Sequence, residues 1–350
     1  MKLAAWIVLA LVVSACGPST QGTTSTTPVS TSTTLTTVSS TTTTVPATTT
    51  TITTAWSPPE ICDCPDEIAA SVPVGDDGVT YRNVGVEEAE ANGPGALEID
   101  EDGTFIVLDT PGQAVVLASA ENIERVTLHW EGLQALIDVQ PTTSGFVVLD
   151  LPFGNNQPRL IDLDSDGGVN QVLGLPDGLW LEDGLTGIGL APNGDIWVEL
   201  ELGVNVAQRD LPTDTYQLFD GYPYPNGLYR PLSWFEPIIE FQAGDVTLEI
   251  ASRLGGTMTS SLIGVNPDNS FVVWSIELTQ DEDGVLHTTE QALWYDESGA
   301  LIATADLPRD DQFVYVPLPV ALGPDGYIYY LQSAEEEVHV LRLGWHTPAG

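Results

Sequence analysis

One short unit recurs along most of this chain, and it restricts the fold more than any other feature. The unit is a strand of small and apolar residues, a tight turn rich in Gly, Asp and Asn, and a second apolar strand. Clear copies lie at 97–107, 187–198 and 320–329, and degenerate copies lie at 135–149 and 262–274. The turn dipeptides favour positive φ, which hairpins between right-twisted strands require. The sequence therefore predicts repeated antiparallel hairpins.

The spacing of these copies indicates which repeat fold they build. Successive copies are roughly 40 to 57 residues apart, except for one gap of about 75 in which Gly244-Asp245 is the candidate for a divergent copy. That period is typical of four-stranded propeller blades, and segments 159–168 and 292–302 look like the outer hairpins of such blades. We predict an all-β propeller of six blades. Five blades and two β-sandwiches are the alternatives, and the sandwiches leave the repeat unexplained.

Two of the turns resemble those of a known group of propellers. Segments 192–198 (Pro-Asn-Gly-Asp-Ile-Trp-Val) and 323–329 (Gly-Pro-Asp-Gly-Tyr-Ile-Tyr) are similar to blade motifs of NHL-repeat, lyase and gluconolactonase-like propellers. For the gluconolactonase-like enzymes the resemblance implies a hydrolase with a metal in the central channel. In that family a metal-binding Asp precedes a Gly ahead of the conserved turn, whereas this chain has Thr186 before Gly187. The metal site therefore does not carry over with the fold.

The first residues have the pattern of an export signal. Lys2 precedes an apolar run of about ten residues, which is too short to span a bilayer. The four residues Val-Ser-Ala-Cys that end at Cys16 resemble the bacterial lipobox, which implies that Cys16 becomes an acylated N-terminus on the outer face of the bacterial cell membrane. We expect residues 1–15 to be a lipoprotein signal peptide. An ordinary secreted protein with an incidental Cys16 is the alternative.

A low-complexity segment follows the signal. Residues 16–57 are dominated by Thr and Ser with scattered Pro, and they offer almost no large apolar side chain to offset the entropy of ordering the chain. We expect a disordered, lipid-anchored linker, either bare or O-glycosylated like a mucin stalk. The propeller domain is expected at 58–350.

The charge of the chain excludes one class of partner. Fifty acidic residues stand against nine basic ones, a formal net charge of −41. Such a surface repels nucleic acid and anionic lipid, so we expect no nucleic-acid partner, a monomer, and membrane attachment only through acylated Cys16. A salty habitat that screens the repulsion and the binding of divalent cations are two explanations of this acidity.

Two cysteines remain if Cys16 is acylated. Cys62 and Cys64 stand at the start of the expected domain, separated by one residue, and we expect them to form a disulfide. A locally closed loop, a link to another molecule and redox activity are the three roles for this pair.

One acidic segment is a candidate calcium loop. Asp162, Asp164, Asp166, Gly168 and Asn170 belong to a D-x-D-x-D-G-x-x-N pattern, which resembles the calcium loops of integrin-type propellers. Its first, third, fifth and ninth positions supply oxygen ligands, but the twelfth is Leu, so the bidentate acid of an EF-hand is missing. An ordinary hairpin turn explains the same residues equally well.

Five aromatic residues form a second candidate site. Tyr222, Tyr224, Tyr229, Trp234 and Phe235 lie close together in a proline-rich segment. Aromatic side chains on a stiff loop lose little entropy on binding and present flat faces to a sugar or peptide. The alternative is that they fill a junction between blades.

No complete catalytic motif is visible. The chain has no nucleophile elbow, phosphate-binding glycine loop or zinc helix motif. The anchor, the linker and this absence favour a non-catalytic acidic propeller that binds a protein, glycan or cation at the cell envelope. The alternative is a propeller enzyme, a glycoside hydrolase, lyase or lactonase, whose acids face each other across the channel and leave no linear signature. Two or three inward carboxyl groups with raised pKa values would favour the enzyme.

Overall fold

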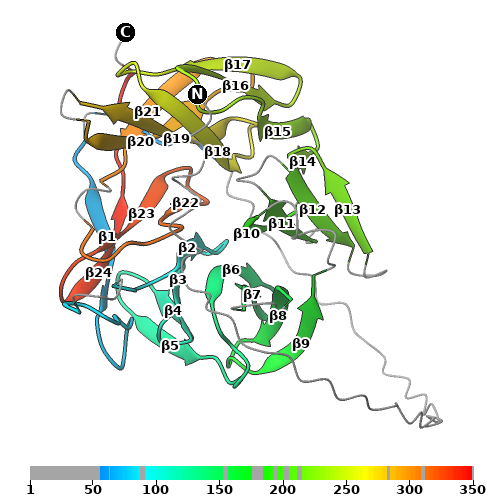
Figure 1. Ribbon diagram of the computed structural model, residues 1–350, viewed down its shortest axis with the longest axis vertical. Helices are drawn as coiled ribbons and strands as arrows, with labels where there is room; N and C mark the ends of the chain where they lie inside the picture. The colour runs from blue at the N-terminus through cyan, green and yellow to red at the C-terminus, as the bar shows by residue number, and fades with distance from the viewer. Residues whose placement is uncertain are drawn as a thin grey trace. The chain divides into compact units, whose positions relative to one another are not determined.

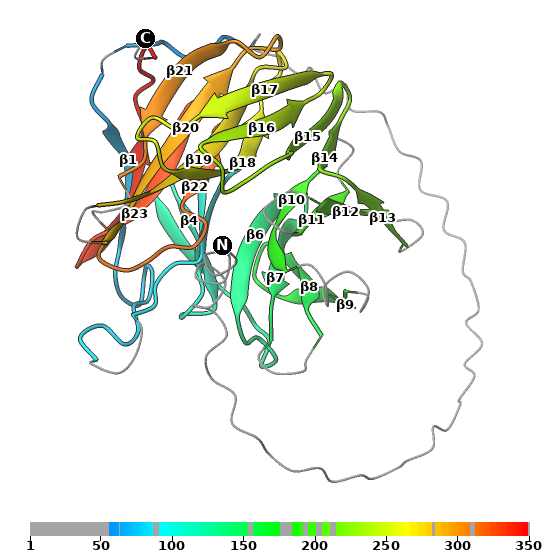
Figure 2. The same ribbon diagram turned by 45° about the horizontal axis from the view of Figure 1, so that its top comes forward.

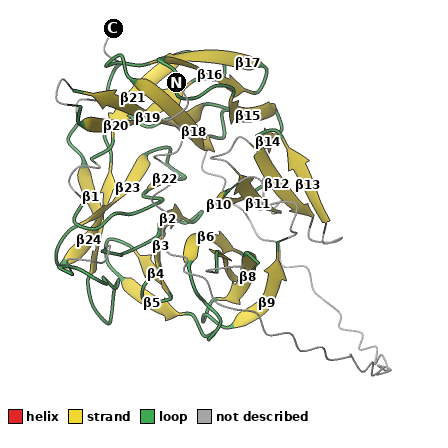
Figure 3. Cartoon of the chain, in the orientation of Figure 1, coloured by secondary structure: helices red, strands yellow, loops and turns green. Residues whose placement is uncertain are grey.

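Strands form all the regular secondary structure in the described part of the computed structural model (Figure 3). Residues 56–348 are described, apart from 63, 87–90, 153–156, 176–183, 192–194, 201–204, 211–214, 282–283 and 309–311. The predicted signal peptide, Cys16 and all but the last two residues of the predicted linker lie outside this part. No helix within it is long and apolar enough to cross a membrane.

The strands form six four-stranded antiparallel sheets around a common centre (Figure 1). We call these sheets blades 1 to 6. Blade 1 is β2 (Ala96–Ile99), β3 (Phe105–Asp109), β4 (Ala114–Ala118) and β5 (Ile123–Thr127); blade 2 is β6 (Leu136–Thr142), β7 (Gly145–Asp150), β8 (Arg159–Asp164) and β9 (Val169–Gly174); blade 3 is β10 (Leu185–Leu190), β11 (Ile196–Leu200), β12 (Asn205–Asp210) and β13 (Thr215–Phe219).

The second half of the domain repeats this arrangement. Blade 4 is β14 (Tyr222–Tyr224), β15 (Gly227–Pro231), β16 (Ile238–Ala243) and β17 (Val246–Ala251); blade 5 is β18 (Thr257–Val265), β19 (Phe271–Gln280), β20 (Leu286–Tyr295) and β21 (Leu301–Asp306); blade 6 is β22 (Val320–Leu322), β23 (Ile328–Ser333), β24 (Glu337–Arg342) and β1 (Glu67–Pro73). The predicted all-β fold with six propeller blades is confirmed.

Blade 6 joins the two ends of the domain. Strand β1 pairs antiparallel with β24, so the first strand of the domain is the outermost strand of its last blade (Figure 2). The residues before β1 continue this contact, because Ile61 forms a bridge with Trp345 and the Cys62 N–H donates to the Trp345 carbonyl at 2.8 Å. The ring is thus closed by hydrogen bonds between segments from opposite ends of the domain.

The recurring sequence unit is the first hairpin of a blade. The five copies found in the sequence contain or overlap the first two strands of blades 1, 2, 3, 5 and 6, and the two expected outer hairpins are β8–β9 and β20–β21. One assignment was wrong: Gly244-Asp245 connects β16 to β17, which is the outer hairpin of blade 4. The first hairpin of that blade turns at Pro225-Asn226, within a Tyr- and Pro-rich segment that lacks the apolar pattern of the other copies.

Apolar side chains fill the junctions between blades. The junction of blades 6 and 1, for example, buries Val72, Leu97, Val107 and Leu331. At the junction of blades 3 and 4 the buried set among described residues is only Ala191, Trp197 and Val206, with partly buried Tyr222 and Tyr224 packed against it. Aromatic rings therefore replace aliphatic side chains at this junction.

Buried acids also stabilise the interior of blade 1 and of blade 2. Asp109 and Asp150 end the second strands of these blades, and their side chains are fully buried. Each pairs with an arginine, Arg125 and Arg159 respectively, at 2.6 Å. Asp150 also accepts the backbone N–H of Ala135 at 2.8 Å, which fixes the loop that leads into blade 2. Charge and hydrogen-bonding capacity are both satisfied at these two acids.

Candidate active site

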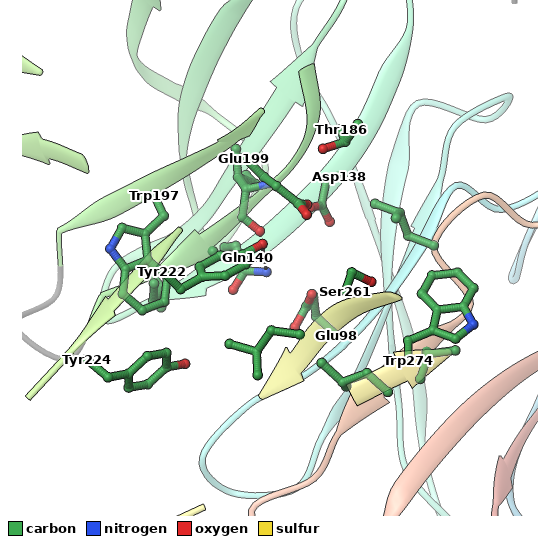
Figure 4. Close-up of a pocket in the computed structure, with 17 residues that line it drawn as sticks. Glu98, Asp138, Gln140, Thr186, Trp197, Glu199, Tyr222, Tyr224, Ser261 and Trp274 are labelled. Carbon is green, nitrogen blue, oxygen red and sulfur yellow. Dashed lines mark hydrogen bonds between the residues drawn. The ribbon is translucent and has the colours of Figure 1, made fainter. Parts of the chain in front are cut away.

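A cavity of about 230 Å³ lies where the first strands of the blades meet (Figure 4). Its lining has two kinds of wall, one acidic and polar and one apolar. The polar residues are Glu98, Asp138, Gln140, Thr186, Glu199, Tyr222, Tyr224 and Ser261; the apolar residues include Ile188, Leu190, Trp197, Leu262, Ile263, Trp274, Leu318 and Val320. No Lys, Arg or His is among the described residues that line it.

Strand geometry explains why these side chains reach the cavity. Side chains two residues apart in a strand lie on the same face, so Asp138 and Gln140 of β6 both point to the cavity. The same spacing places Tyr222 and Tyr224 of β14 there. Most polar groups of the site therefore come from the innermost strands of different blades, and Glu199 comes from β11, the second strand of blade 3.

Asp138 is almost completely buried, with 3% of its surface exposed. Its two oxygens accept backbone N–H groups, Oδ1 from Val139 and Oδ2 from Ile188, each at 2.8 Å. Burial raises the pKa of Asp138 to about 7; the two N–H donors oppose this rise and the charge of Glu199 adds to it. This carboxyl group is therefore fixed in position and titrates near neutral pH.

Glu199 of β11 is the second carboxyl group of the site. Burial raises its pKa to about 7, although hydrogen bonds from the hydroxyl groups of Tyr222 and Thr186 stabilise the charged form. Burial and the neighbouring Glu199 in turn raise the pKa of Tyr222 well above its usual value. Tyr222 thus remains protonated and donates to Glu199.

Gly187 lies between the two carboxyl groups. A Cβ atom at this position would lie 2.9 Å from Glu199 Oε2 and 3.0 Å from Asp138 Oδ2. These two oxygens are therefore at most about 6 Å apart, and any larger residue at Gly187 would push into the space between them. The glycine makes the close approach of the two acids possible.

Glu98 of β2 is a third acid in the cavity. Burial and the charge of Asp138 raise its pKa well above the usual value, while a hydrogen bond with the Gln140 side chain opposes this rise. The Gln140 amide is itself held in place, because its Nε2 donates to the Ile188 carbonyl at 3.2 Å. Three carboxyl groups from three blades thus share one small space.

Aromatic rings form the wall next to Glu199. The ring of Trp197 packs edge-to-face against those of Tyr222 and Tyr224, with centroids 5.3 Å apart in both pairs. Trp274, from blade 5, lines another part of the cavity (Figure 4). The cavity thus offers both acids and aromatic rings to a ligand.

The five aromatic residues singled out in the sequence lie in three different environments. Tyr222 and Tyr224 line the cavity, Tyr229 is buried in the core shared by blades 4 and 5, and Trp234 and Phe235 are exposed in the connection from β15 to β16. The structure therefore brings only Tyr222 and Tyr224 to the candidate site.

The candidate calcium residues lie in the hairpin between β8 and β9. Asp164 Oδ1 accepts the backbone N–H groups of Asp166 at 3.0 Å and Gly168 at 2.7 Å, while Asp162 lies within β8 and Asn170 within β9. No three His, Cys, Asp or Glu side chains of the described residues are grouped closely enough to hold a metal ion. Calcium binding here stays a prediction, and the described acids of the cavity do not form a group that could hold a metal ion either.

Cys62 and Cys64 form a disulfide, as expected from the sequence. The pair lies next to β1, beside the contact of Cys62 with Trp345 that helps to close the ring. Neither cysteine lines the cavity.

Glu98, Asp138 and Glu199 were not identified as site residues from the sequence. The available signal was an acid within the first hairpin of a repeat whose other residues are mostly apolar. Among 50 acidic residues this signal is weak, because only the register of each strand decides which acids face the channel.

No protein-family model and no curated protein sequence matches the chain. One solved structure with a similar fold is virginiamycin B lyase from Staphylococcus aureus, with 12% sequence identity, a TM-score of 0.39, and coverage of 75% of this chain and 98% of that chain. A second is a luciferin-regenerating enzyme, with 12% identity, a TM-score of 0.43, and coverage of 73% of this chain and 94% of that chain. A third is regucalcin, a calcium-binding protein from Agrobacterium tumefaciens, with 13% identity, a TM-score of 0.36, and coverage of 73% of this chain and 92% of that chain. These values concern fold alone. The chain is a six-bladed β-propeller with an acidic pocket at its centre, and the resemblance seen in its blade motifs is confirmed at the level of fold.

Proposed function

We propose that the propeller is an acid–base hydrolase whose catalytic groups are Asp138 and Glu199. The observation that carries this proposal is the pair of inward carboxyl groups, at most about 6 Å apart across Gly187. Their pKa values of about 7 keep one proton on the pair at neutral pH, as general acid catalysis requires. This arrangement supports the enzyme over the non-catalytic binding module that the sequence favoured.

The environment of each acid assigns its role. Two backbone N–H groups point at the oxygens of Asp138, so this group holds the negative charge as nucleophile or base. The hydrogen-bond partners of Glu199 are the side-chain hydroxyl groups of Tyr222 and Thr186. A hydroxyl group can accept as well as donate a hydrogen bond, so we assign the shared proton to Glu199, which donates it to the leaving group. Hydrolysis of a glycosidic bond is the reaction class that uses two carboxyl groups in this way. Glu199 Oε2 and Asp138 Oδ2 are at most about 6 Å apart, which is nearer to the spacing of retaining enzymes than to that of inverting ones.

The aromatic wall supports a sugar-like substrate. Trp197, Tyr222 and Tyr224 provide ring surface next to the acids, which is where a pyranose ring would pack. We further propose that acylated Cys16 and the linker hold this enzyme outside the cell membrane. A cysteine variant, Cys16→Ser, is then expected to leave the protein soluble after export, as measured by detergent partitioning.

The test is hydrolysis of a panel of nitrophenyl α- and β-glycosides by the full-length protein. Asp138→Asn and Glu199→Gln are each expected to lower kcat by about 10²- to 10⁴-fold, because each removes a group that transfers protons or attacks. Glu249→Gln neutralises an exposed acid on β17 and serves as the matched control. Full activity in both pocket variants, or no hydrolysis of any glycoside in the panel, would overturn the proposal.

A further inference from the structure

The cavity contains an acid that the proposed reaction does not use. Asp138 and Glu199 suffice for acid–base hydrolysis, yet Glu98 lies beside them, held by Gln140. Removing carboxyl groups from water without a counter-charge is costly, so proteins usually pair them. The described lining of the cavity provides no cation to Glu98.

The rest of the domain shows how this chain treats acids that serve only the fold. Asp109 and Asp150 each pair with an arginine at 2.6 Å. Glu277 accepts three backbone N–H groups, from Arg253, Leu254 and Gly256, at 2.8 to 3.1 Å. The acids of the cavity lack an arginine although the chain uses its few basic residues elsewhere. Protonation neutralises these acids in part, as their raised pKa values indicate, and a cationic ligand is the other source of positive charge.

The neighbouring rings suit the same kind of ligand. Trp197, Tyr222 and Tyr224 form one continuous aromatic wall, with centroid distances of 5.3 Å. Aromatic faces attract cations through their quadrupole, and this attraction strengthens where water is excluded. Figure 4 shows these rings and the three carboxyl groups arranged around the same space. Carboxyl groups together with aromatic rings are the usual receptor for an organic ammonium group.

The size of the cavity limits the ligand. A cavity of about 150 Å³ holds benzene. The 230 Å³ here therefore accommodates a ligand, or one end of a ligand, of roughly ten non-hydrogen atoms. Its apolar wall, with Ile188, Leu190 and Ile263, favours a molecule that carries carbon surface as well as charge.

We propose that the central pocket binds a small organic ammonium ion, with Glu98 as its anionic partner and the Trp197–Tyr222–Tyr224 wall as its aromatic partner. If the ion is also the substrate, the substrate class is an amine-bearing sugar or a similar cation, and this step alone rests on the proposed function. Binding itself requires no catalysis. The cation favours the ionised form of the neighbouring acids, so binding releases protons near neutral pH.

Isothermal titration of the full-length protein at low ionic strength tests the inference with two pairs of probes. The pairs are choline with its neutral isostere 3,3-dimethylbutan-1-ol, and glucosamine with glucose. At least one ammonium probe is expected to bind tenfold or more tightly than its neutral counterpart. The apparent heat is expected to vary with the ionisation enthalpy of the buffer, because protons are released.

Variants locate the binding. Glu98→Gln is expected to lower the affinity for the ammonium probe tenfold or more, whereas Glu249→Gln leaves it unchanged. Tyr224→Leu, which removes a ring and keeps all three acids, is expected to weaken binding severalfold and provides the test if Glu98→Gln does not fold. Equal affinity for charged and neutral probes, no binding of either ammonium probe, or unchanged affinity in Glu98→Gln would overturn the inference.

Two further arms separate the alternatives. Binding of CaCl2 that blocks the pocket while neither ammonium probe binds would overturn the organic cation in favour of a metal ion. Ammonium binding without glycoside hydrolysis would leave the inference standing and the proposed hydrolase wrong. Hydrolysis of neutral glycosides, together with equal affinity for charged and neutral probes, would leave the proposed hydrolase standing and overturn the inference.

Discussion

The buried acids of blades 1 and 2 and those of the central cavity have the same chemistry but opposite surroundings. Asp150, like Asp109, is fully buried and paired with an arginine at 2.6 Å. Asp138 is buried to nearly the same extent, but its neighbours include Glu199, and none of the described residues that line its cavity is basic. A chain with nine basic residues against 50 acidic ones thus neutralises acids that support the fold and leaves the channel acids unneutralised. This difference, rather than acidity itself, marks the candidate site.

The largest expected effect lies at the neutralised acids. Asp150→Asn keeps an oxygen for the backbone N–H groups of Gln134 and Ala135 but leaves Arg159 without a charged partner. We expect the free energy of unfolding to fall by about 3 kcal/mol or more, because a buried ion pair is broken from one side. Urea unfolding at neutral pH measures this change. Asp220→Asn, which removes an exposed acid that lies 3.4 Å from Arg230, is the control and is expected to cost about 0.5 kcal/mol or less.

For the channel acids we expect the opposite: replacing one by its neutral amide should raise the free energy of unfolding at neutral and higher pH. The folded-state pKa of Glu199, about 7, lies above its ordinary value of 4.5. Its contribution to stability is therefore complete below about pH 4 and is lost as the pH rises through 7, at up to about 1.4 kcal/mol per pH unit. Glu199→Gln removes this loss. We expect the variant and the wild type to be equally stable near pH 4 and the variant to be more stable by about 2 kcal/mol near pH 8.

Paired urea titrations at several pH values measure this difference, and comparing variant with wild type cancels the pH dependence of the other acids. A variant that is less stable than the wild type near pH 8 would show that Glu199 serves the fold in the way that Asp150 does. The comparison between the two regions would then no longer identify the cavity as a functional site.

The sequence revealed the fold better than the site, for a physical reason. Turns with positive φ and alternating apolar strands are local features, so the repeat and five of the six first hairpins were visible. Blade 4 was hidden because Pro223 and Pro225 interrupt the apolar pattern, and its aromatic residues serve the cavity and the blade junction instead. Strand pairing within blades 2 and 5 is also local, which is why their outer hairpins were predicted correctly.

The channel acids depend on information that is not local. Asp138 and Glu199 approach each other only because Gly187 has no side chain to fill the space between them. The positions of residues 138, 187 and 199 in the sequence do not indicate that they lie close together. The pairing of Asp109 with Arg125, by contrast, lies within one blade, but the sequence does not reveal that the aspartate is fully buried. Burial is a property of the assembled ring, and it raises the pKa values of Asp138 and Glu199.

The smallest expected effect lies in the β8–β9 hairpin, where the backbone stabilises an acid without help from arginine. Asp164 accepts the N–H groups of Asp166 and Gly168, so Asp164→Ala is expected to cost about 1 kcal/mol, like the loss of a helix cap. Asp164→Asn retains an oxygen for these donors and is expected to cost less. If the hairpin is only a turn, CaCl2 and NaCl at matched ionic strength give the same Tm in thermal unfolding. A calcium-specific rise in Tm that Asp166→Asn abolishes would instead establish the calcium loop predicted from the sequence, and would show that this acid-rich chain recruits a metal ion where it lacks an arginine.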